Sequence, residues 1–406
     1  MPVRPTDGHV YFRDSSLHTC RDSAIPMTSL DGQELIRYAR QIRLPEIGID
    51  GQTRLRQASV LIVGAGGLGS PAALYLAAAG VGRIGIADGD RVDATNLQRQ
   101  ILYSSKDVGV AKTDVAIDRL SSLNPTVRIE AFSQRVTSGN ALELVESFDV
   151  VIDGTDNFPT RYLLSDACVL AGRPLIYGSV DRFAGQASVF VAEGAPCYRC
   201  LFPNPPEPGS VQNCAEAGVL GVLPGLIGTV QATEALKLLL GVGETLAGRL
   251  LMVDALRMDF RSIAVERDPE CPACGRGEIT ELADYEAFCD PSRATTRATT
   301  DELDVDPRAL ARELSSGRAP VLIDVREPYE WSIGRLPSAR LVPLNTLPSA
   351  LGSIDLDADI VVYCHHGMRS EAAAQFLRRA GARHVRNLVG GIDRWSTDVD
   401  GSVDRY

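Results

Sequence analysis

A glycine-rich turn between an apolar strand and a small-residue helix constrains the fold of this chain more than any other feature. The segment 58–90 reads ASVLIVGAGGLGSPAALYLAAAGVGRIGIADGD, and its turn contains Gly64, Gly66, Gly67 and Gly69. Such a turn leaves backbone N–H groups at a helix N-terminus, where phosphate oxygens can bind. Asp88 ends the next strand, a position from which a carboxylate accepts hydrogen bonds from ribose hydroxyls. The segment predicts a βαβ unit that binds a nucleotide, NAD as readily as ATP.

Strand and helix patterns continue along the chain after this unit. Further strand signals lie at 148–157, 174–180, 187–192 and 249–256. Alternating strands and helices favour a mostly parallel sheet with helices on both faces. We therefore predict an α/β fold with a doubly wound, Rossmann-like sheet. Before the first strand, Asp31 is placed to cap a helix. In that helix Leu35, Tyr38 and Ile42 are spaced for one buried stripe.

The 406 residues suffice for two or three domains. Residues 1–29 mix proline, serine, threonine and charges without periodicity, which is typical of a flexible tail. The first α/β domain is expected over 30–275, and the low-complexity run ATTRATT favours a linker over 276–300. The strands VLIDVRE and IVVYCHHG, with the helix SEAAAQFLRRAG, predict a second, smaller α/β domain over 301–406.

Charge and composition exclude several classes of function. Lys plus Arg total 41 against 52 Asp plus Glu, and the net charge of −11 opposes binding to nucleic acid. No apolar run reaches the roughly 20 residues of a membrane span, and MPVRPTDGHVYFRDSS lacks the apolar core of a secretory signal. We therefore expect a cytoplasmic protein. In that compartment the nine cysteines are expected to bind metal, do chemistry or pack in cores rather than form disulfides.

Polar and cationic residues follow the ribose carboxylate closely. Asn96, Arg99 and Lys112 come after Asp88, and Asp156 follows the strand VVID. A hydride-transfer site needs neither these cations nor an acidic metal ligand near the phosphates. A nucleotidyl-transfer site needs both, because cations and Mg²⁺ must neutralise the leaving pyrophosphate. These residues shift the interpretation from NAD towards ATP.

Five segments together resemble one family. They are RYARQIRLPEIG at 37–48, GAGGLGS at 64–70, ADGDRVDATNLQRQ at 87–100, GVAK ending at Lys112, and DGTDN at 153–157. Over about residues 30–275 the chain is similar to the MoeB/ThiF family, the ubiquitin-activating-type adenylyltransferases of sulfur-carrier pathways. Five matching segments are far more specific than the glycine turn alone.

The resemblance implies roles for single residues. It implies that Asp88 holds the ribose and that Asp156 coordinates Mg²⁺. It also implies that the triphosphate is contacted by Asn96, Arg99 and Lys112. Arg40 is expected to reach the nucleotide of a partner subunit, so the resemblance implies a homodimer.

The implied reaction is attack of a protein's C-terminal carboxylate on the α-phosphorus of ATP, which gives an acyl-adenylate and pyrophosphate. A carboxylate is already a nucleophile at neutral pH, so the enzyme need not supply a general base. Catalysis is then mainly alignment together with charge stabilisation by the metal and by Arg40, Arg99 and Lys112.

Two CxxC pairs predict a structural metal site. Cys197 and Cys200 form the first pair, and Cys271 and Cys274 form the second. Four thiolates complete the tetrahedral shell of a structural Zn²⁺, and the family resemblance also points to zinc. Redox-active pairs and an iron–sulfur cluster are the alternatives. Neither pair lies between a strand and a helix in a thioredoxin-like pattern, which disfavours the redox alternative.

Two further cysteines need separate interpretations. Cys214, in VQNCAEAGVLG, lies outside both pairs. The family resemblance implies that it can form a covalent link with the activated carrier, and an ordinary loop cysteine is the alternative. Cys168, in YLLSDACVLAG, is expected to pack in a helix core.

Cys364 follows the strand IVVY and begins the segment CHHGMRS. Backbone N–H groups of this loop can surround the sulfur, and a helix starting at Ser370 would point its positive end at it. Both features favour a thiolate and the anionic outer sulfur of a persulfide. This loop and the segments IDVREPYEW, GRLPSARLVP and LVGGIDRW resemble a single rhodanese domain over 301–406. Arg369 comes five residues after Cys364, one fewer than in a cysteine phosphatase loop, which favours sulfur over phosphate; an inactive structural domain is the other alternative.

Joined together, the two resemblances imply a fused adenylyltransferase and sulfurtransferase of the kind that serves molybdopterin synthesis. The first domain would adenylate the C-terminal Gly-Gly of a ubiquitin-like sulfur carrier, and a Cys364 persulfide would displace AMP to form a thiocarboxylate. The sulfur donor would be thiosulfate or a cysteine desulfurase. A nucleotide-sensing regulatory protein and an NAD-linked oxidoreductase are the alternatives.

Overall fold

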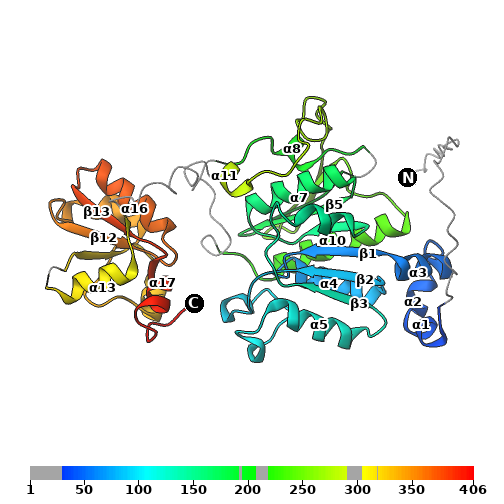
Figure 1. The fold of residues 1–406 in the computed structure, drawn as a ribbon, viewed down its shortest axis with the longest axis horizontal. Helices are drawn as coiled ribbons and strands as arrows, with labels where there is room; N and C mark the ends of the chain where they lie inside the picture. The colour runs from blue at the N-terminus through cyan, green and yellow to red at the C-terminus, as the bar shows by residue number, and fades with distance from the viewer. Residues whose placement is uncertain (1–29, 192–193, 207–217, 290–303, 318) are drawn as a thin grey trace, which may run out of the picture.

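The computed structural model describes residues 30–191, 194–206, 218–289, 304–317 and 319–406. These residues form two α/β units, one built on an eight-stranded sheet and the other on a five-stranded sheet (Figure 1). The expected tail, and the expected linker from residue 290 onwards, lie outside the described residues.

The large sheet is parallel at one end and antiparallel at the other. Its order is β3-β2-β1-β4-β5-β6-β7-β8, with parallel pairs from β3 to β5 and antiparallel pairs from β5 to β8. The strands are β1 Ser59–Val63, β2 Arg83–Ala87, β3 Arg128–Phe132, β4 Val150–Asp153, β5 Leu175–Asp181, β6 Ala184–Phe190, β7 Arg249–Asp254 and β8 Asp259–Ala264. The chain runs outward from β1 to β3 and then returns to β4. Because of this reversal, a crevice is expected at the carboxyl ends of β1 and β4.

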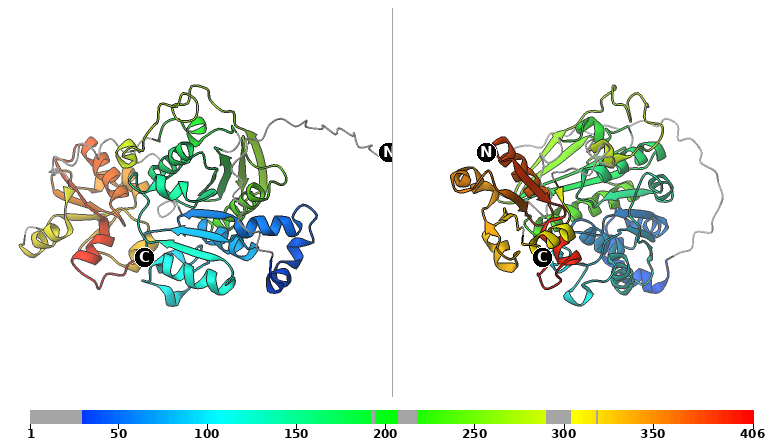
Figure 2. Two further views of the ribbon diagram at one scale, coloured as in Figure 1. Left: turned by 45° about the vertical axis from the view of Figure 1, so that its right-hand side comes forward. Right: turned by 60° about the vertical axis from the view of Figure 1, so that its left-hand side comes forward.

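Helices cover both faces of this sheet, as the doubly wound prediction requires (Figure 2). One core cluster joins the sheet to α4 and α10, and the other joins it to α6 and α7. The helices are α1 Gly32–Arg37, α2 Ala39–Ile42, α3 Gly48–Gln57, α4 Gly69–Ala79, α5 Lys112–Leu123, α6 Ala141–Glu146, α7 Phe158–Ala171, α8 Tyr198–Leu201, α10 Val222–Leu240 and α11 Tyr285–Cys289, with 3₁₀ turns η1 Ala94–Asn96 and η2 Ser105–Asp107. The Rossmann-like fold is therefore confirmed, and its antiparallel end was not predicted.

The first helix differs from its prediction. Asp31 caps it as expected, in a capping box with Glu34. The helix then breaks at Tyr38, so α1 and α2 replace one continuous helix. Tyr38 is buried, but Leu35 is 39% exposed, so the predicted stripe is wrong at that position. Within α1 the buried side chain is that of Glu34, which completes the capping box with Asp31 and pairs with Arg56 at 3.0 Å.

The small unit is an all-parallel sheet with the order β11-β10-β12-β13-β9. Its strands are β9 Asp304–Val305, β10 Val321–Asp324, β11 Arg340–Leu341, β12 Asp359–Tyr363 and β13 His384–Leu388. Its helices are α13 Pro307–Ser315, α14 Pro328–Ile333, α15 Leu347–Ala350, α16 Met368–Arg379 and α17 Gly391–Asp398, with 3₁₀ turns η3 Leu344–Thr346 and η4 Leu351–Ser353. Separate core clusters lie on the two faces, with α16 on one and α13 and α17 on the other. This unit therefore has a core of its own.

Two observations bear on the domain plan and on membranes. Within the expected linker, α11 packs against α7, and Tyr285 donates a hydrogen bond to Asp166 Oδ2 at 2.6 Å. The exact domain limits stay a prediction.

In the part of the chain that the structure describes, no helix has both the length and the apolar character that a bilayer span requires.

Candidate functional site

The glycine turn brings three segments of the large unit into close contact. β1 ends at Val63 and α4 begins at Gly69. Gly64 has a φ of +89°, and a Cβ there would lie 2.7 Å from the carbonyl oxygen of Gly154. A Cβ on Gly69 would collide with the carbonyl oxygen of Gly64. Only glycine permits this packing, which leaves the N-terminal end of α4 facing the crevice between β1 and β4.

Asp88 and Lys112 meet beside this turn. Asp88, directly after β2, accepts a hydrogen bond from the backbone N–H of Ala65 at 2.8 Å. Lys112 begins α5 and is only 4% exposed. Its Nζ lies 3.0 Å from Asp90 Oδ2 and 3.6 Å from Asp88 Oδ2. The predicted ribose carboxylate and one predicted phosphate cation therefore lie side by side.

A cleft of about 320 Å³ opens here, within the size range of small-molecule sites. The predicted nucleotide residues that line it are Gly64, Gly66, Gly67, Asp88, Arg99, Lys112 and Asp156. Asn96 accepts a hydrogen bond from Arg99 Nη2 at 2.8 Å and so supports a lining residue from behind. Arg40 is exposed on α2 and is not a lining residue of its own chain's cleft. Of the predicted nucleotide-site residues, Gly69, Asn96 and Arg40 do not line this cleft.

Arg161 is a cleft residue that the sequence analysis missed. It lies on α7, is 7% exposed, and donates from Nη2 to the carbonyl oxygen of Thr155 at 3.3 Å. Among the described residues, its Nε and the Oδ2 of Asp153 are buried without a hydrogen-bond partner. Burial raises the pKa of Asp153, and the nearby Arg161 opposes that rise. The sequence did carry a signal for Arg161, since it is an arginine within a largely apolar helix. A buried cation requires a partner or a ligand, so such a residue indicates a possible binding site.

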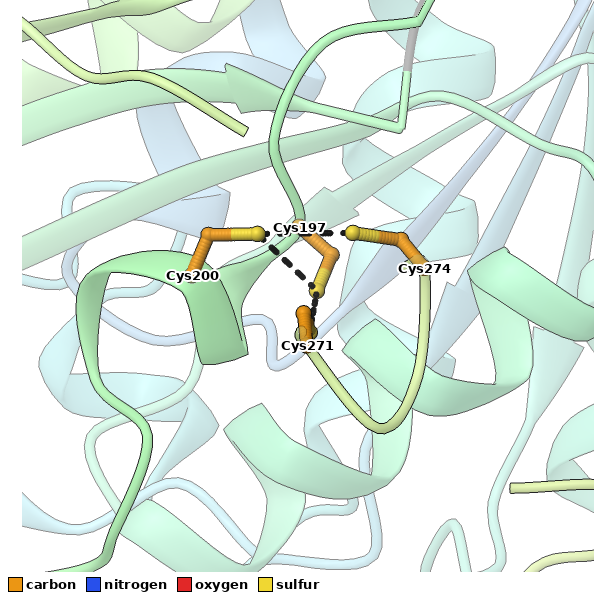
Figure 3. Close-up of side chains that lie close together, drawn as sticks. All are labelled: Cys197, Cys200, Cys271 and Cys274. Atoms are coloured by element: carbon orange, nitrogen blue, oxygen red, sulfur yellow. Dashed lines mark hydrogen bonds between the residues drawn. The ribbon is translucent and has the colours of Figure 1, made fainter. Parts of the chain in front are cut away.

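The four CxxC cysteines converge on one point (Figure 3). Cys197 Sγ lies 3.5 Å from Cys271 Sγ and 4.0 Å from Cys200 Sγ, and Cys200 Sγ lies 3.3 Å from Cys274 Sγ. All four sulfurs lie within 4.8 Å of one another, and all four residues are free thiols. The cluster connects the start of α8 with the segment after β8.

These sulfur positions fit a tetrahedral metal. With Zn–S bonds of about 2.3 Å, the sulfurs of an ideal tetrahedron lie about 3.8 Å apart, close to the observed spacings. Burial raises the pKa of the Cys197 thiol, and it raises the pKa of Cys200 to about 11. Thiolates at this depth therefore need a cation. The four-cysteine cluster can hold zinc.

Cys364 lies between β12 and α16 of the small unit and is 1% exposed. Its Sγ accepts a hydrogen bond from the backbone N–H of Gly367 at 3.1 Å and one from Ser370 Oγ at 3.4 Å. Gly367 has a φ of +102°, a conformation that side chains rarely adopt. The helix begins at Met368, slightly earlier than expected, and its N-terminal end adjoins the loop. The sulfur therefore lies among donors, as predicted.

A buried ion pair beside this loop was missed. Both terminal nitrogens of Arg369 donate to the carboxylate of Glu330, each at 2.7 Å. Although burial opposes ionisation, Arg369 lowers the pKa of Glu330 to about 2. Behind this pair, Arg326 is fully buried and binds Asp324 at 2.6 Å. Glu330 entered the sequence analysis only within the motif IDVREPYEW, whose spacing carries no signal of burial.

Cys214 and Cys168 are the other two cysteines for which the sequence predicted a role. Cys214 lies outside the described residues, so its covalent role stays a prediction. Cys168 is fully buried in α7, where burial raises the pKa of its thiol, as expected for a core residue.

Fold and sites together define a class of protein: a nucleotide-type α/β unit with a four-cysteine cluster, joined to a smaller unit that presents a cysteine in a loop of donors. Family models agree with that class. The ThiF family model matches residues 38–273, and the rhodanese-like domain model matches residues 306–398. The chain belongs to the ThiF family and carries a rhodanese-like domain.

Curated relatives share this two-part arrangement. The chain is 45% identical over 392 residues to the probable adenylyltransferase/sulfurtransferase MoeZ of Mycobacterium tuberculosis, covering 94% of this chain and 97% of that one. It is 44% identical to the adenylyltransferase and sulfurtransferase MOCS3 of Sus scrofa, covering 94% and 90%. The sulfur carrier protein adenylyltransferase of Thermus thermophilus is 56% identical over 263 residues, which is 63% of this chain and 97% of that protein.

Solved structures agree on the fold of the large unit. The crystal structure of Escherichia coli MccB with MccA-N7isoASN gives a TM-score of 0.54 at 23% identity, covering 59% of this chain and 74% of that one. The crystal structure of Escherichia coli MccB with ATP gives a TM-score of 0.52 at 23% identity, covering 59% of this chain and 74% of that one. The relatives' names favour adenylyl and sulfur transfer, and they lend no support to the nucleotide-sensing and NAD-linked alternatives.

Proposed function

We propose that the chain activates the C-terminal glycine of a ubiquitin-like sulfur-carrier protein with ATP and then converts it to a thiocarboxylate. One observation carries the proposal: the same chain presents a cation-lined cleft and, separately, a cysteine held among hydrogen-bond donors. Relatives named as adenylyltransferase and sulfurtransferase over 94% of the chain support it.

Adenylation needs alignment more than acid–base chemistry. The carrier carboxylate forms a bond to the α-phosphorus, and the bond between that phosphorus and the bridging oxygen of pyrophosphate breaks. Asp88 would hold the ribose, and Arg99 and Lys112 would take up charge on the departing phosphates. The glycine turn supports this arrangement, because it leaves the end of α4 open to phosphate.

Mg²⁺ would bind at Asp156, which is exposed in the cleft. The donor set fits a hard cation: Asp153, whose Oδ2 has no partner among the described residues, lies within electrostatic reach of Asp156. When bound, the ion supplies charge neutralisation on the phosphates.

Arg40 would act across a homodimer. Its side chain is exposed on α2 and is not a lining residue of its own cleft, which is what a residue that serves a partner's cleft requires. In that role Arg40 would contact the phosphates of the nucleotide bound to the other subunit.

Zinc bound by Cys197, Cys200, Cys271 and Cys274 would be structural. Four thiolates leave no open position for a substrate. The cluster joins α8 to the segment that follows β8, far apart in sequence, so the metal would stabilise the antiparallel end of the sheet.

Sulfur transfer would begin with a persulfide on Cys364. Its outer sulfur attacks the acyl carbon of the adenylate, and AMP leaves. The product is an acyl disulfide between carrier and Cys364. A second thiol, in this proposal Cys214, attacks the Cys364 sulfur, which releases the carrier thiocarboxylate and leaves a Cys214–Cys364 disulfide for an external thiol to reduce.

The sulfur donor would be thiosulfate or the persulfide of a cysteine desulfurase, and the compartment would be the cytoplasm. Molybdopterin synthesis is the pathway suggested by the resemblance of the chain to fused enzymes of that route.

The test separates the two half-reactions. Cys364→Ala should leave carrier-dependent ATP–pyrophosphate exchange intact and abolish thiocarboxylate, measured by mass spectrometry as the oxygen-to-sulfur mass change on the carrier's Gly-Gly terminus. Cys168→Ala, a change at a buried core residue, is the matched control and should keep both activities. Loss of both activities in Cys364→Ala would contradict separate sites.

A further inference from the structure

Tyr406 is packed against the loop that holds Cys364. Its ring stacks on the ring of His365, with centroids 4.1 Å apart and planes 8° from parallel. His365 directly follows Cys364, so this contact lies one residue from the reactive cysteine. No role for Tyr406 follows from the sequence motifs or from the adenylation and sulfur-transfer steps.

The hydroxyl of Tyr406 joins two buried charges. It accepts a hydrogen bond from Arg326 Nη1 at 2.6 Å and donates one to Glu330 Oε1 at 2.8 Å. The Glu330 carboxylate also accepts both terminal nitrogens of Arg369 and the backbone N–H of Glu327. With four donors, the Glu330 carboxylate is saturated and held in one orientation.

This carboxylate sets the position of the Arg369 guanidinium; Arg369 is the second residue of α16, directly after the Cys364 loop. Arg369 lies within electrostatic reach of Cys364, and its terminal nitrogens are fixed by Glu330. A shift of Glu330 would therefore move the guanidinium relative to the sulfur. Catalytic rates are sensitive to such shifts, because a displacement of about 1 Å can cost about 100-fold.

The His365 imidazole packs against two rings, that of Tyr406 at 4.1 Å and that of His366 at 3.9 Å between centroids. Burial is the main cause that lowers the pKa of His365 to about 4. The charged groups near this imidazole include His366, Asp393, Glu330 and Arg326, and Asp93 also interacts with it. His365 is therefore neutral at physiological pH, and removing the Tyr406 ring would uncover the part of the imidazole on which it stacks.

We propose that Tyr406 is a positioning residue of the sulfur-transfer site: its hydroxyl fixes the Glu330 carboxylate that orients Arg369 beside Cys364, and its ring holds His365 against the loop. This inference rests on the proposed sulfur transfer through Cys364. Tyr406 itself contacts neither the sulfur nor the carrier in this assignment.

The experiment uses the full chain with Tyr406→Phe, which keeps the ring, and Tyr406→Ala, which removes ring and hydroxyl. Tyr329→Ala is the matched control, because Tyr329 precedes Glu330 but is 66% exposed. Sulfur transfer is measured from thiosulfate to cyanide, which needs Cys364 but no carrier, and also as carrier thiocarboxylate. The pKa of His365 is followed by NMR of ¹³C-labelled histidine, with the signal assigned through His365→Gln.

For Tyr406→Ala we expect kcat for sulfur transfer to fall about 10- to 100-fold with KM nearly unchanged, and the His365 pKa to rise above about 4. Tyr406→Phe should lose about tenfold in kcat, the value of one hydrogen bond to a charged group, and keep the low His365 pKa. ATP–pyrophosphate exchange and Tyr329→Ala should match wild type.

Two results would overturn the inference: wild-type transfer rates in both Tyr406 variants, or a His365 pKa that stays near 4 in Tyr406→Ala. Misfolding is detected by tryptophan fluorescence, because Trp331 and Trp395 both lie in the small unit. A wild-type chain that transfers sulfur to neither cyanide nor carrier refutes the proposed function instead, and the His365 titration still decides whether Tyr406 holds the loop.

Discussion

Replacing Glu330 by glutamine should destabilise the small unit strongly, because the carboxylate is 3% exposed and pairs with Arg369 through both oxygens. A pKa lowered from 4.5 to about 2 corresponds to about 3 kcal/mol, at about 1.36 kcal/mol per pH unit. Breaking a buried pair from one side costs about 3–5 kcal/mol, which agrees with that value. We therefore expect Glu330→Gln to lower the free energy of unfolding by about 3 kcal/mol at pH 7.

The pH dependence gives this prediction a sign. Because folding lowers the pKa of Glu330, its contribution is complete above about pH 5 and is lost as pH falls towards 2. Wild-type stability should therefore decline over that interval by about 3 kcal/mol more than the stability of Glu330→Gln.

Tryptophan fluorescence during urea unfolding is a selective assay. The chain has two tryptophans, Trp331 and Trp395, and both belong to the small unit, so unfolding of the large unit contributes no tryptophan signal. Asp357→Asn is the matched control, because the Asp357 carboxylate is 83% exposed and its Oδ1 lies 3.7 Å from Arg383 Nε. Loss of this exposed pair should change the free energy of unfolding by about 0.5 kcal/mol or less. A destabilisation below about 1 kcal/mol for Glu330→Gln, or an equal acid-induced loss in variant and wild type, would refute the reasoning.

Two further outcomes are expected in the large unit. Lys112→Met and Arg40→Ala should each lower ATP–pyrophosphate exchange about 100-fold or more. Mixing the two variants should restore about a quarter of wild-type activity, because about half of the dimers then hold one intact cleft out of two. No recovery in the mixture would exclude action of Arg40 across subunits. A strong chelator, or Cys271→Ser, should remove about one zinc per chain, as measured by elemental analysis. Loss of the metal should also lower the melting temperature of the large unit, followed by circular dichroism. A metal-free chain with an unchanged melting temperature would contradict a structural metal.

Much of the fold was accessible from sequence because local rules dominate in it. The turn at Gly64 and the buried strands flanking it follow from residue type and apolar runs, and the structure confirms them. The antiparallel end was not predicted, since hydrophobic periodicity does not encode strand direction. Leu35 was assigned to the core incorrectly, because the buried position on α1 is taken by Glu34, whose partner Arg56 lies on another helix.

The sites divide along a similar line. Residues in short motifs, such as Asp88 and the CxxC cysteines, could be assigned because their spacing reflects a local backbone. Arg161 and Glu330 could not, because their importance arises from burial and from partners distant in sequence. Tyr406 is the extreme case: 42 positions separate it from Cys364, yet its ring stacks on the neighbouring His365.

The two sites hold their cations in different ways, and the difference bears on how each works. Lys112 shares one nitrogen between Asp88 and the 71%-exposed Asp90, so an incoming phosphate can replace a solvated partner at little cost. Arg369 is bound at both terminal nitrogens by a carboxylate that is already saturated, so exchange there would leave a buried charge unpaired. Nucleotide binding should therefore rearrange side chains in the first cleft, whereas the sulfur loop should keep one geometry whether or not Cys364 carries sulfur.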